Sequence, residues 1–276
     1  MLTKFLANAA SSLRPLRYAI ETATYNAFYR SPETTKELMV WKDKYKGQAM
    51  LVVGNGPSLN QTPLNEFADI PSVGMNKIDL LFPRTTWRPT VVLCMNDVVV
   101  QQHWQNWLKL DIPVILSWKS RWFVPRRVRA KFAYFLITNK RDFSEDFAKD
   151  VGRAHSVTYA ALQFAYWCGA DPIVVFGVDH SFVQGDKADL YERRVGADVN
   201  HFDPNYFAAG TLWGTANLQG NESDYRLSLA AFEAGNRHIY DATIGGKLNV
   251  FPKISLDEAR AILKGNGYGP RAAEDG

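Results

Sequence analysis

The chain has 276 residues, of which 46% are hydrophobic and 22% are charged, a composition typical of a soluble globular protein rather than a disordered or fibrous one. This length allows one large α/β domain, or a domain with a lid, to bury a substantial core. The formal net charge of +4 is too small to predict a nucleic-acid partner, and it suits an anionic small substrate or a membrane surface equally well. A membrane-spanning helix needs a run of about 18 or more apolar residues, and the sequence contains no such run.

The first 36 residues are predicted to form an N-terminal helical segment. Its beginning is amphipathic, with an apolar stripe made of Leu2, Phe5, Leu6 and Ala9. Pro15 is expected to kink or restart this helix. Two alternatives stay open for the segment: packing on the domain body or on a second subunit of a homo-oligomer, or attachment of residues 1–30 to an anionic inner membrane leaflet.

The cellular location is predicted from two further features. The start of the chain lacks an apolar core followed by a small-residue cleavage site, so it does not predict a signal peptide. Cys94 and Cys168 both lie in apolar runs without metal-ligand spacing, which favours buried free thiols in a reducing compartment. We therefore expect a cytoplasmic protein, with peripheral contact to the inner membrane as the open alternative.

Seven short apolar runs recur through the middle of the chain and predict strands: 49–54, 71–75, 90–95, 112–117, 133–137, 172–177 and 237–242. Several are apolar throughout rather than alternating, as expected of strands covered on both faces. Helical patterns occupy 156–169, with Ser156 as N-cap, and 222–236. The pattern predicts an α/β fold, a Rossmann-like doubly wound and mostly parallel sheet, over residues 37–265.

Two segments do not fit this pattern. Residues 183–221 are rich in glycine, charges and aromatic side chains and show no sustained period. Connections longer than about 15 residues inside a compact domain are usually functional, so this segment is predicted to be a lid-like insertion. Residues 266–276 are glycine-rich and polar and predict a disordered tail.

The stretch Gly54-Asn55-Gly56-Pro57-Ser58 follows the first predicted strand and suggests an anion site. Gly54 and Gly56 permit positive φ angles and close approach of the backbone, so that main-chain N–H groups can face a phosphate. Asn55 and Ser58 add short polar side chains. The loop is not a Walker A motif, because no Gly-Lys-Ser/Thr follows, and by itself a GxG turn is a weak signal.

Other predicted strand ends carry polar residues as well. Asn76 follows the second run, while Asn96 and Asp97 follow the third. The carboxyl ends of neighbouring parallel strands converge on one crevice, so these side chains are expected to meet Asn55 there. The alternative for each asparagine alone is a helix N-cap.

The predicted strand 172–177 ends in Gly177, with Asp179 and His180 just beyond it. Asp179 is interpreted as a ligand of ribose hydroxyls, as a magnesium ligand or as a base, with capping of a turn as the structural alternative.

Three further residues are chemical candidates. His201 and Asp203, two positions apart in the predicted lid, are the candidates for an oriented acid/base pair, with a solvated loop histidine as the structural alternative. Lys247 is a candidate to neutralise a phosphate, or else an ordinary surface lysine.

The stretch 117–132 is basic and aromatic. It is interpreted as a solvated helix face with its tryptophans anchored in the core, because the rest of the chain has no basic stripe and a nucleic-acid partner is therefore not expected. Contact with an acidic substrate or a membrane phosphate is an intermediate alternative.

These pieces together resemble the 6-hydroxymethylpterin diphosphokinase-like domain family, which includes the Maf-type flagellin glycosyltransferases. More distantly, they resemble the bacterial sialyltransferases of glycosyltransferase family 42. The resemblance spans about residues 37–255 and is carried by "VVGNGPSL", Asn76 in "GMNKIDL", "MND" at 95–97, "SVTYAALQFAYWCGADPIVVFGVDHSF", "NHFDPNYF" and "RHIYDATIGGKLNVFP".

The sialyltransferase resemblance implies a nucleotide lying over the Gly54–Ser58 loop. Counterparts of Asn55, Gly56, Asn76 and Asn96 would hold a CMP-sugar, and a segment similar to Gly177–Asp179 would hold the cytidine. No metal would be required, and a lid histidine would be the general base. This chain has Gln219 at the position of that histidine, which leaves His201 as the nearest substitute.

The diphosphokinase resemblance implies different chemistry, in which ATP with Mg²⁺ transfers pyrophosphate to a dihydropterin and Asp97, Asp179 or Asp203 are the metal candidates. The favoured hypothesis is a glycosyltransferase that uses a nucleotide-activated sugar, preferably a CMP-sugar, and a glycan or lipid-linked sugar as acceptor in cell-surface glycan synthesis. The alternatives are pyrophosphoryl transfer and a non-catalytic nucleotide-binding scaffold.

Overall fold

The computed structural model describes residues 13–30, 32–183, 188 and 190–265. The apolar stripe expected at Leu2 to Ala9 and the tail expected at 266–276 lie outside this part of the chain. Within it, no helix is long and apolar enough to cross a membrane.

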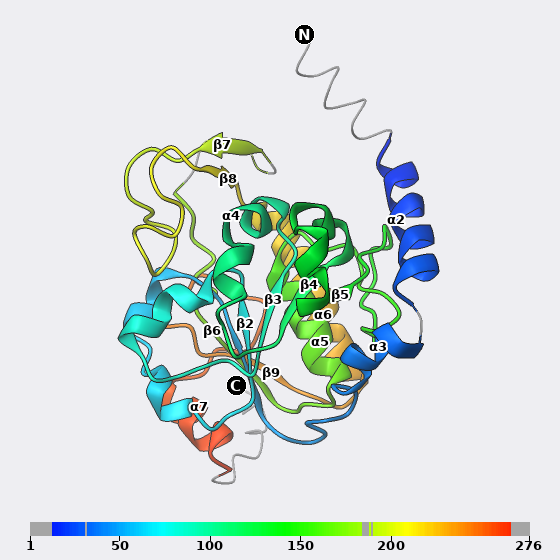
Figure 1. Ribbon diagram of the computed structural model, residues 1–276. Helices are drawn as coiled ribbons and strands as arrows, with labels where there is room; N and C mark the ends of the chain where they lie inside the picture. The colour runs from blue at the N-terminus through cyan, green and yellow to red at the C-terminus, as the bar shows by residue number, and fades with distance from the viewer. Residues whose placement is uncertain (1–12, 31, 184–187, 189, 266–276) are drawn as a thin grey trace.

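A seven-stranded parallel sheet forms the centre of the molecule (Figure 1). Its strands are β1 (Met50–Val53), β2 (Ser72–Met75), β3 (Val91–Cys94), β4 (Val114–Ser117), β5 (Ala133–Phe135), β6 (Ile173–Phe176) and β9 (Ile239–Asp241). Each lies inside one of the predicted apolar runs, and all six pairings between them are parallel. The predicted Rossmann-like α/β fold is confirmed.

The strand order is β5-β4-β3-β2-β1-β6-β9, which places a change of direction beside β1. The chain winds outward from β1 to β5 and then returns to pair β6 with the other side of β1, so that Leu51 faces Ser72 on one side and Val174 on the other. In open α/β sheets, ligands bind outside the carboxyl ends of the strands at such a switch point.

Helices cover both faces of the sheet, in keeping with the burial of every residue in β1, β2, β3, β4 and β6. The α-helices are α2 (Arg14–Phe28), α3 (Pro32–Met39), α4 (Asp97–Trp107), α5 (Val157–Trp167), α6 (Leu218–Ala234) and α7 (Leu256–Leu263). Short 3₁₀ helices are η1 (Pro57–Asn60), η2 (Leu64–Phe67), η3 (Ile78–Arg84), η4 (Trp118–Phe123) and η5 (Arg126–Lys131). Met50 and Val52 pack with α3, α5 and α6, while Leu51 and Val53 pack with α2, α4 and α7.

The predicted lid contains regular structure that the sequence pattern did not indicate. β7 (Tyr191–Arg193) and β8 (Leu212–Gly214) form an antiparallel pair above the carboxyl ends of the central strands (Figure 1). α6 begins at Leu218, before the predicted lid boundary at residue 221. The predicted boundary between residues 36 and 37 falls inside α3.

The basic stretch 117–132 differs from its interpretation as one solvated helix. It folds as η4 and η5, with Trp118 buried but Trp122 63% exposed. Arg121, by contrast, is buried and stacks on both tryptophan rings. Only Trp118 is therefore anchored in the core as expected.

Candidate nucleotide site

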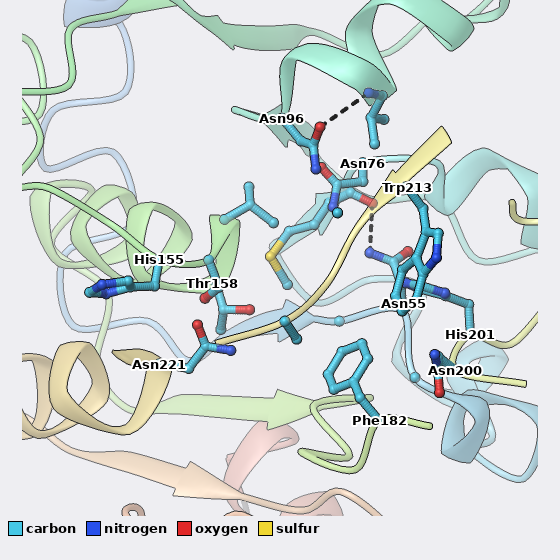
Figure 2. A pocket seen from close by; sticks show the side chains of 18 of the residues that line it. Asn55, Asn76, Asn96, His155, Thr158, Phe182, Asn200, His201, Trp213 and Asn221 are labelled. Carbon is cyan, nitrogen blue, oxygen red and sulfur yellow. Dashed lines mark hydrogen bonds between the residues drawn. The ribbon is translucent and has the colours of Figure 1, made fainter. Parts of the chain in front are cut away.

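A cavity of about 340 Å³ lies at the carboxyl ends of β1, β2, β3 and β6 (Figure 2). It is lined by most of the residues predicted for the site: Gly54, Asn55, Gly56, Asn76, Asn96, Asp97, Gly177, Asp179, His180 and His201. Ser58, Asp203 and Lys247 are not part of the lining. The switch point of the sheet thus brings together residues that are up to 147 positions apart, from Gly54 to His201.

The glycines of the first loop are required for a reason other than the predicted one. Gly54 and Gly56 do not have positive φ angles, and Gly56 lies at −69°. A Cβ atom on Gly54 would stand 2.2 Å from the Gly177 carbonyl oxygen, and one on Gly56 would stand 1.8 Å from Asp179 Oδ2. Of the three, only Gly177 adopts a left-handed conformation, with φ +70°. Gly54 and Gly56, just after β1, therefore permit close contact with the loop after β6.

The N–H groups of Gly54, Gly56 and Ser58 do not form the predicted cradle for a phosphate. The N–H of Gly54 donates to the Phe176 carbonyl at 2.7 Å, and that of Gly56 donates to the Gly177 carbonyl at 2.9 Å. The N–H of Ser58 donates to Asp179 Oδ1 at 3.0 Å, and the Ser58 hydroxyl donates to Oδ2 at 2.7 Å. These donors join the β1 and β6 loops to each other and do not face the cavity.

Asp179 is therefore a structural centre as well as part of the cavity wall. Burial raises the pKa of its carboxyl group, and the two hydrogen bonds from Ser58 oppose that rise. Its carbonyl oxygen accepts the N–H of Lys247 at 2.9 Å, whereas the Lys247 side chain is exposed. His180, at φ +54°, bonds Glu222 of α6 through Nε2 at 3.0 Å.

The three predicted asparagines have different roles. Asn96 is the N-cap of α4, since its Oδ1 accepts the N–H groups of Val98 and Val99 at 3.0 and 3.3 Å. Asn55 donates through Nδ2 to the Met75 carbonyl at 3.0 Å, an interaction drawn in Figure 2. Asn76 lies just beyond β2 at φ +52°. The N-cap alternative is confirmed for Asn96.

Unpaired amide oxygens distinguish this cavity. Oδ1 of Asn55, Oδ1 of Asn76 and Oδ1 of Asn221 are buried and have no hydrogen-bond partner among the described residues. All three residues line the cavity, and Asn221, from the first turn of α6, was not predicted. Leaving such a group without a partner costs about 1–3 kcal/mol, which a ligand that brings hydroxyl or amino donors can recover.

The beginning of α5 offers donors that Gly54, Gly56 and Ser58 do not. Ser156 occupies the N-cap position, but its side chain makes no capping hydrogen bond and pairs with the Tyr225 hydroxyl at 3.1 Å instead. Ser156, Val157 and Thr158 all line the cavity. The N–H groups in the first turn of a helix lack intrahelical partners and carry the positive end of the helix dipole, so this end of α5 favours an anion.

His201 pairs with Asp198 and not with Asp203. Its Nδ1 lies 2.8 Å from Asp198 Oδ2, and the Asp198 side chain is 1% exposed. Asp203 instead accepts the N–H of Asn205 at 2.8 Å and lies 4.0 Å from Arg84 Nη2. The predicted histidine–aspartate pair exists with a different aspartate.

Asp198 is held in its ionised form by its surroundings. Burial raises its pKa, but hydrogen bonds from His201 and Asn200 and the charges of His201 and Arg194 outweigh burial and bring the pKa below its usual range. The His201 ring stacks on Tyr206 at 4.0 Å with an interplanar angle of 3°. With Nδ1 engaged by Asp198, a neutral His201 has Nε2 available as a proton acceptor.

A second buried histidine–aspartate pair lies at the other side of the cavity and was not predicted. Asp224 accepts the backbone N–H of His155 at 2.7 Å, and its carboxylate lies 3.1 Å from Nδ1 of the same residue. Burial raises the pKa of Asp224, and the interactions with His155 oppose the rise. Figure 2 shows the His155 ring turned away from the centre of the cavity, so the pair fastens the segment before α5 to α6.

The remaining wall is aromatic, with one cation. Phe182, Tyr191, Tyr206, Phe207 and Trp213 line it. Lys119 of η4 also lines the cavity, and its Nζ lies 3.2 Å from Asp97 Oδ2. Aromatic faces beside hydrogen-bonding groups suit a nucleobase or a sugar ring.

The predicted magnesium candidates are engaged separately. Asp97 pairs with Lys119, Asp179 with Ser58, and Asp203 with its own loop and Arg84. Over the described ranges, no group of three or more His, Cys, Asp or Glu side chains is arranged to hold a metal ion. Gln219, at the position of the family histidine, is exposed in the first turn of α6 and does not line the cavity.

Comparison with solved structures finds similar chains, including the following two. The first is the sialyltransferase CstII from Campylobacter jejuni in complex with the substrate analogue CMP-3FNeuAc, with 10% identity, 75% of this chain and 86% of that chain covered, and a TM-score of 0.42. The second is the same enzyme in complex with cytidine-5'-monophosphate. It has 9% identity and a TM-score of 0.39, and the match covers 76% of this chain and 86% of that chain. No family model and no curated protein sequence matches the chain, so the cavity itself is the basis for a functional proposal.

Proposed function

We propose that this protein is a glycosyltransferase that binds a nucleotide-activated sugar in the cavity and transfers the sugar to a hydroxyl group of a glycan or lipid-linked acceptor. The observation that carries the proposal is that His201, oriented by Asp198, lines the same cavity as three asparagines whose amide oxygens are unpaired. The preference for a CMP-sugar follows the sequence resemblance to the family 42 sialyltransferases.

Donor binding follows from the hydrogen-bonding groups of the wall. Ribose, sugar hydroxyl and base amino groups are donors, and they suit the amide oxygens of Asn55, Asn76 and Asn221. A phosphate is an acceptor, and it suits the first turn of α5 with the hydroxyls of Ser156 and Thr158. The aromatic wall offers faces on which a base or sugar ring stacks.

The proposed reaction uses His201 as general base. The acceptor oxygen bonds to the anomeric carbon of the sugar while the bond between that carbon and the phosphate oxygen breaks. The proton of the acceptor hydroxyl passes to His201 Nε2, and the nucleotide leaves as an anion next to the positive end of α5. Asp198 keeps the proton of the ring on Nδ1 and stabilises the charged ring that forms.

Neither alternative has a comparable observation in its favour. Pyrophosphoryl transfer from ATP needs carboxylates gathered around Mg²⁺, and the candidate aspartates have separate partners. A non-catalytic scaffold would have no use for an oriented histidine in the cavity.

Thermal unfolding with nucleotides tests the binding step. CMP, UDP, GDP, AMP and ATP are added singly, each with and without Mg²⁺. A ligand at about 100 times its Kd stabilises the native state by about 2.7 kcal/mol, so a genuine ligand gives a clear shift. We expect stabilisation by CMP without Mg²⁺. Stabilisation by ATP alone, and only with Mg²⁺, would refute sugar transfer, and no shift with any nucleotide would favour the scaffold.

Release of CMP from CMP-N-acetylneuraminate tests the chemical step. His201→Ala should keep CMP binding and lose CMP release by about 10²–10⁴-fold, the usual contribution of a positioned base. The matched control is His238→Ala, which removes a histidine paired with Asp171 at 3.2 Å outside the cavity lining. Full activity of His201→Ala would show that another group accepts the proton.

A further inference from the structure

The outward side of α2 is apolar, which is the reverse of an ordinary surface helix. On the inward side, Tyr25 is buried against Trp118, and Tyr29, just after the helix, is buried against Tyr134. The residues that recur on successive turns of the opposite side are Leu13, Leu16, Ile20, Ala23 and Ala27, all exposed. Leu16 is 58% exposed and Ile20 is 53% exposed. An exposed apolar stripe of this kind, without a charged side chain, marks a surface that binds a partner or a membrane.

The neighbouring 3₁₀ helix η4 also exposes apolar side chains. Trp122 is 63% exposed, and Phe123 is also exposed. η4 is fixed to α2 by the ion pair between Arg121 Nη1 and Glu21 Oε2 at 2.6 Å, and by the Trp118 indole N–H, which donates to Thr24 Oγ1 at 3.0 Å. These contacts fix α2 and η4 relative to each other, and we call their exposed apolar residues together the α2–η4 face.

Basic side chains border this face. The segment 117–132 contains six lysines and arginines and no acidic residue. Arg126, Arg127 and Lys131 of η5 are exposed and form no ion pair with the described part of the chain. The Arg129 guanidinium lies 5.3 Å above the Trp122 ring, which connects the basic border to the apolar centre.

The charge distribution favours an anionic bilayer over a second copy of this chain as the partner of this face. A second copy of this chain would add another uncompensated basic cluster to the assembly, with no acidic residue in 117–132 to meet it. A bilayer with anionic headgroups offers acyl chains to the apolar residues and negative charge to the basic border, and exposed tryptophan is typical of such an interface.

We propose that the α2–η4 face binds the surface of an anionic lipid bilayer. Leu16, Ile20 and Trp122 enter the boundary between headgroups and acyl chains, and Arg126, Arg127 and Lys131 contact the headgroups. This differs from attachment through residues 1–30 alone, because half of the surface comes from a segment about 100 residues later in the chain.

The position of the face also gives it a connection to the nucleotide cavity. Lys119, in the same turn of η4 as Trp122, lines that cavity. A second cavity of about 70 Å³ is lined by Arg17, Tyr18 and Glu21 of α2 and shares Met95 and Lys119 with the first. If the proposed sugar transfer holds, this side is where a lipid-linked acceptor would approach; the membrane contact itself does not depend on that function.

Vesicle flotation with the full chain tests the proposal. One set of vesicles contains phosphatidylcholine only, and the other contains about 30% phosphatidylglycerol, each at about 0.1 M and 0.5 M NaCl. We expect binding to the anionic vesicles at low salt, weakened at high salt and absent with phosphatidylcholine alone. No binding to anionic vesicles at low salt would overturn the proposal.

Two sets of variants separate the apolar centre from the basic border. Arg126→Gln/Arg127→Gln/Lys131→Gln should weaken binding roughly 100-fold, because each basic residue near an anionic surface contributes about fivefold. The matched control, Lys46→Gln/Arg193→Gln/Lys264→Gln, removes the same charge from exposed positions elsewhere and should weaken binding by about tenfold at most. Equal losses in both triple variants would mean that net charge, not this face, causes binding, and would refute the proposal.

The apolar variant Leu16→Gln/Ile20→Gln/Trp122→Gln addresses the other occupant. Its expected behaviour is an unchanged circular dichroism spectrum, because all three side chains are exposed, with loss of vesicle binding. Light scattering after size exclusion gives the molar mass of both proteins. If the wild type forms a dimer that this variant abolishes, and neither protein floats with vesicles, the face is a contact between copies and the membrane proposal is wrong.

Discussion

Gly56→Ala tests the account of the glycine loop, because the structure predicts its cost. The added Cβ would stand 1.8 Å from Asp179 Oδ2, so the carboxylate must leave its place. It then loses the hydrogen bonds from the Ser58 N–H at 3.0 Å and the Ser58 hydroxyl at 2.7 Å. Hydrogen bonds to a charged group are worth about 1.5–3 kcal/mol each. Because Asp179 borders the cavity, water restores part of this, and we expect a loss of about 2–4 kcal/mol in the free energy of unfolding.

Ser58→Ala completes a double-mutant cycle. It removes only the hydroxyl bond and should cost about 1–2 kcal/mol. The double variant should be little less stable than Gly56→Ala alone, because both changes remove the same bond, which corresponds to a coupling energy of about 1–2 kcal/mol. Denaturant unfolding measures all four proteins. Gly214→Ala is the control, since its Cβ would lie at an ordinary 3.4 Å from Tyr191.

Two results would refute this reasoning. One is a Gly56→Ala protein within about 0.5 kcal/mol of the wild type, the range of a surface change without consequence. The other is additive losses in the double variant, which would show that Gly56 and Ser58 do not act through the same carboxylate. The expected loss also means that substitution of Gly56 tests loop packing before it tests nucleotide binding.

Three further variants address other buried groups. Asp198→Asn should lower kcat for CMP release by about 10²–10⁴-fold with little change in KM, since the amide cannot hold the His201 proton on Nδ1; an unchanged kcat would contradict the assignment. Burial lowers the pKa of Lys77 to about 8, so between pH 7 and pH 9 the unfolded chain binds more protons than the native protein does. Over this range the free energy of unfolding of the wild type should therefore rise by roughly 1 kcal/mol relative to that of Lys77→Met. A difference between the two proteins that does not change with pH would contradict this. Glu21→Ala leaves the buried Arg121 guanidinium without its carboxylate, so hydrogen exchange within α2 should accelerate while exchange in the sheet stays constant.

The pattern of apolar residues predicted the strands well because each strand is encoded by a short, continuous stretch of sequence. A run such as 172–177 is apolar at every position only if both of its faces are covered, and β6 lies within it. The convergence of polar residues at the strand ends follows from parallel topology alone. Asn55, Asn76 and Asp179 therefore line the cavity, as predicted.

Side-chain partners were predicted less well because they depend on loop geometry. Asp198 and Asp203 are three and two positions from His201, and distance along the chain does not separate them. The loop decides: Asp203 accepts the N–H of Asn205, and Asp198 turns inward to the ring. His155 and Asp224 are 69 positions apart, and no local pattern connects them.

The pattern around Ser156 did contain a usable signal. An N-cap serine before a helix that crosses the sheet places the beginning of that helix at the same edge as the strand ends. The prediction used Ser156 only to locate α5 and not as part of the site. Asn221 gave no such signal, because the start of α6 was predicted too late in the chain.

The pairing of β1 with β6 has a consequence for how the protein is made. Val53 and Phe176 are register partners although 123 residues separate them, and the contact between Gly54 and Gly177 lies just beyond. A nascent chain that has left the ribosome as far as β5 can form five strands, but one edge of β1 still lacks its neighbour. The cavity can form only when β6 fills that edge, so it cannot assemble before β6, in the second half of the chain, has been made.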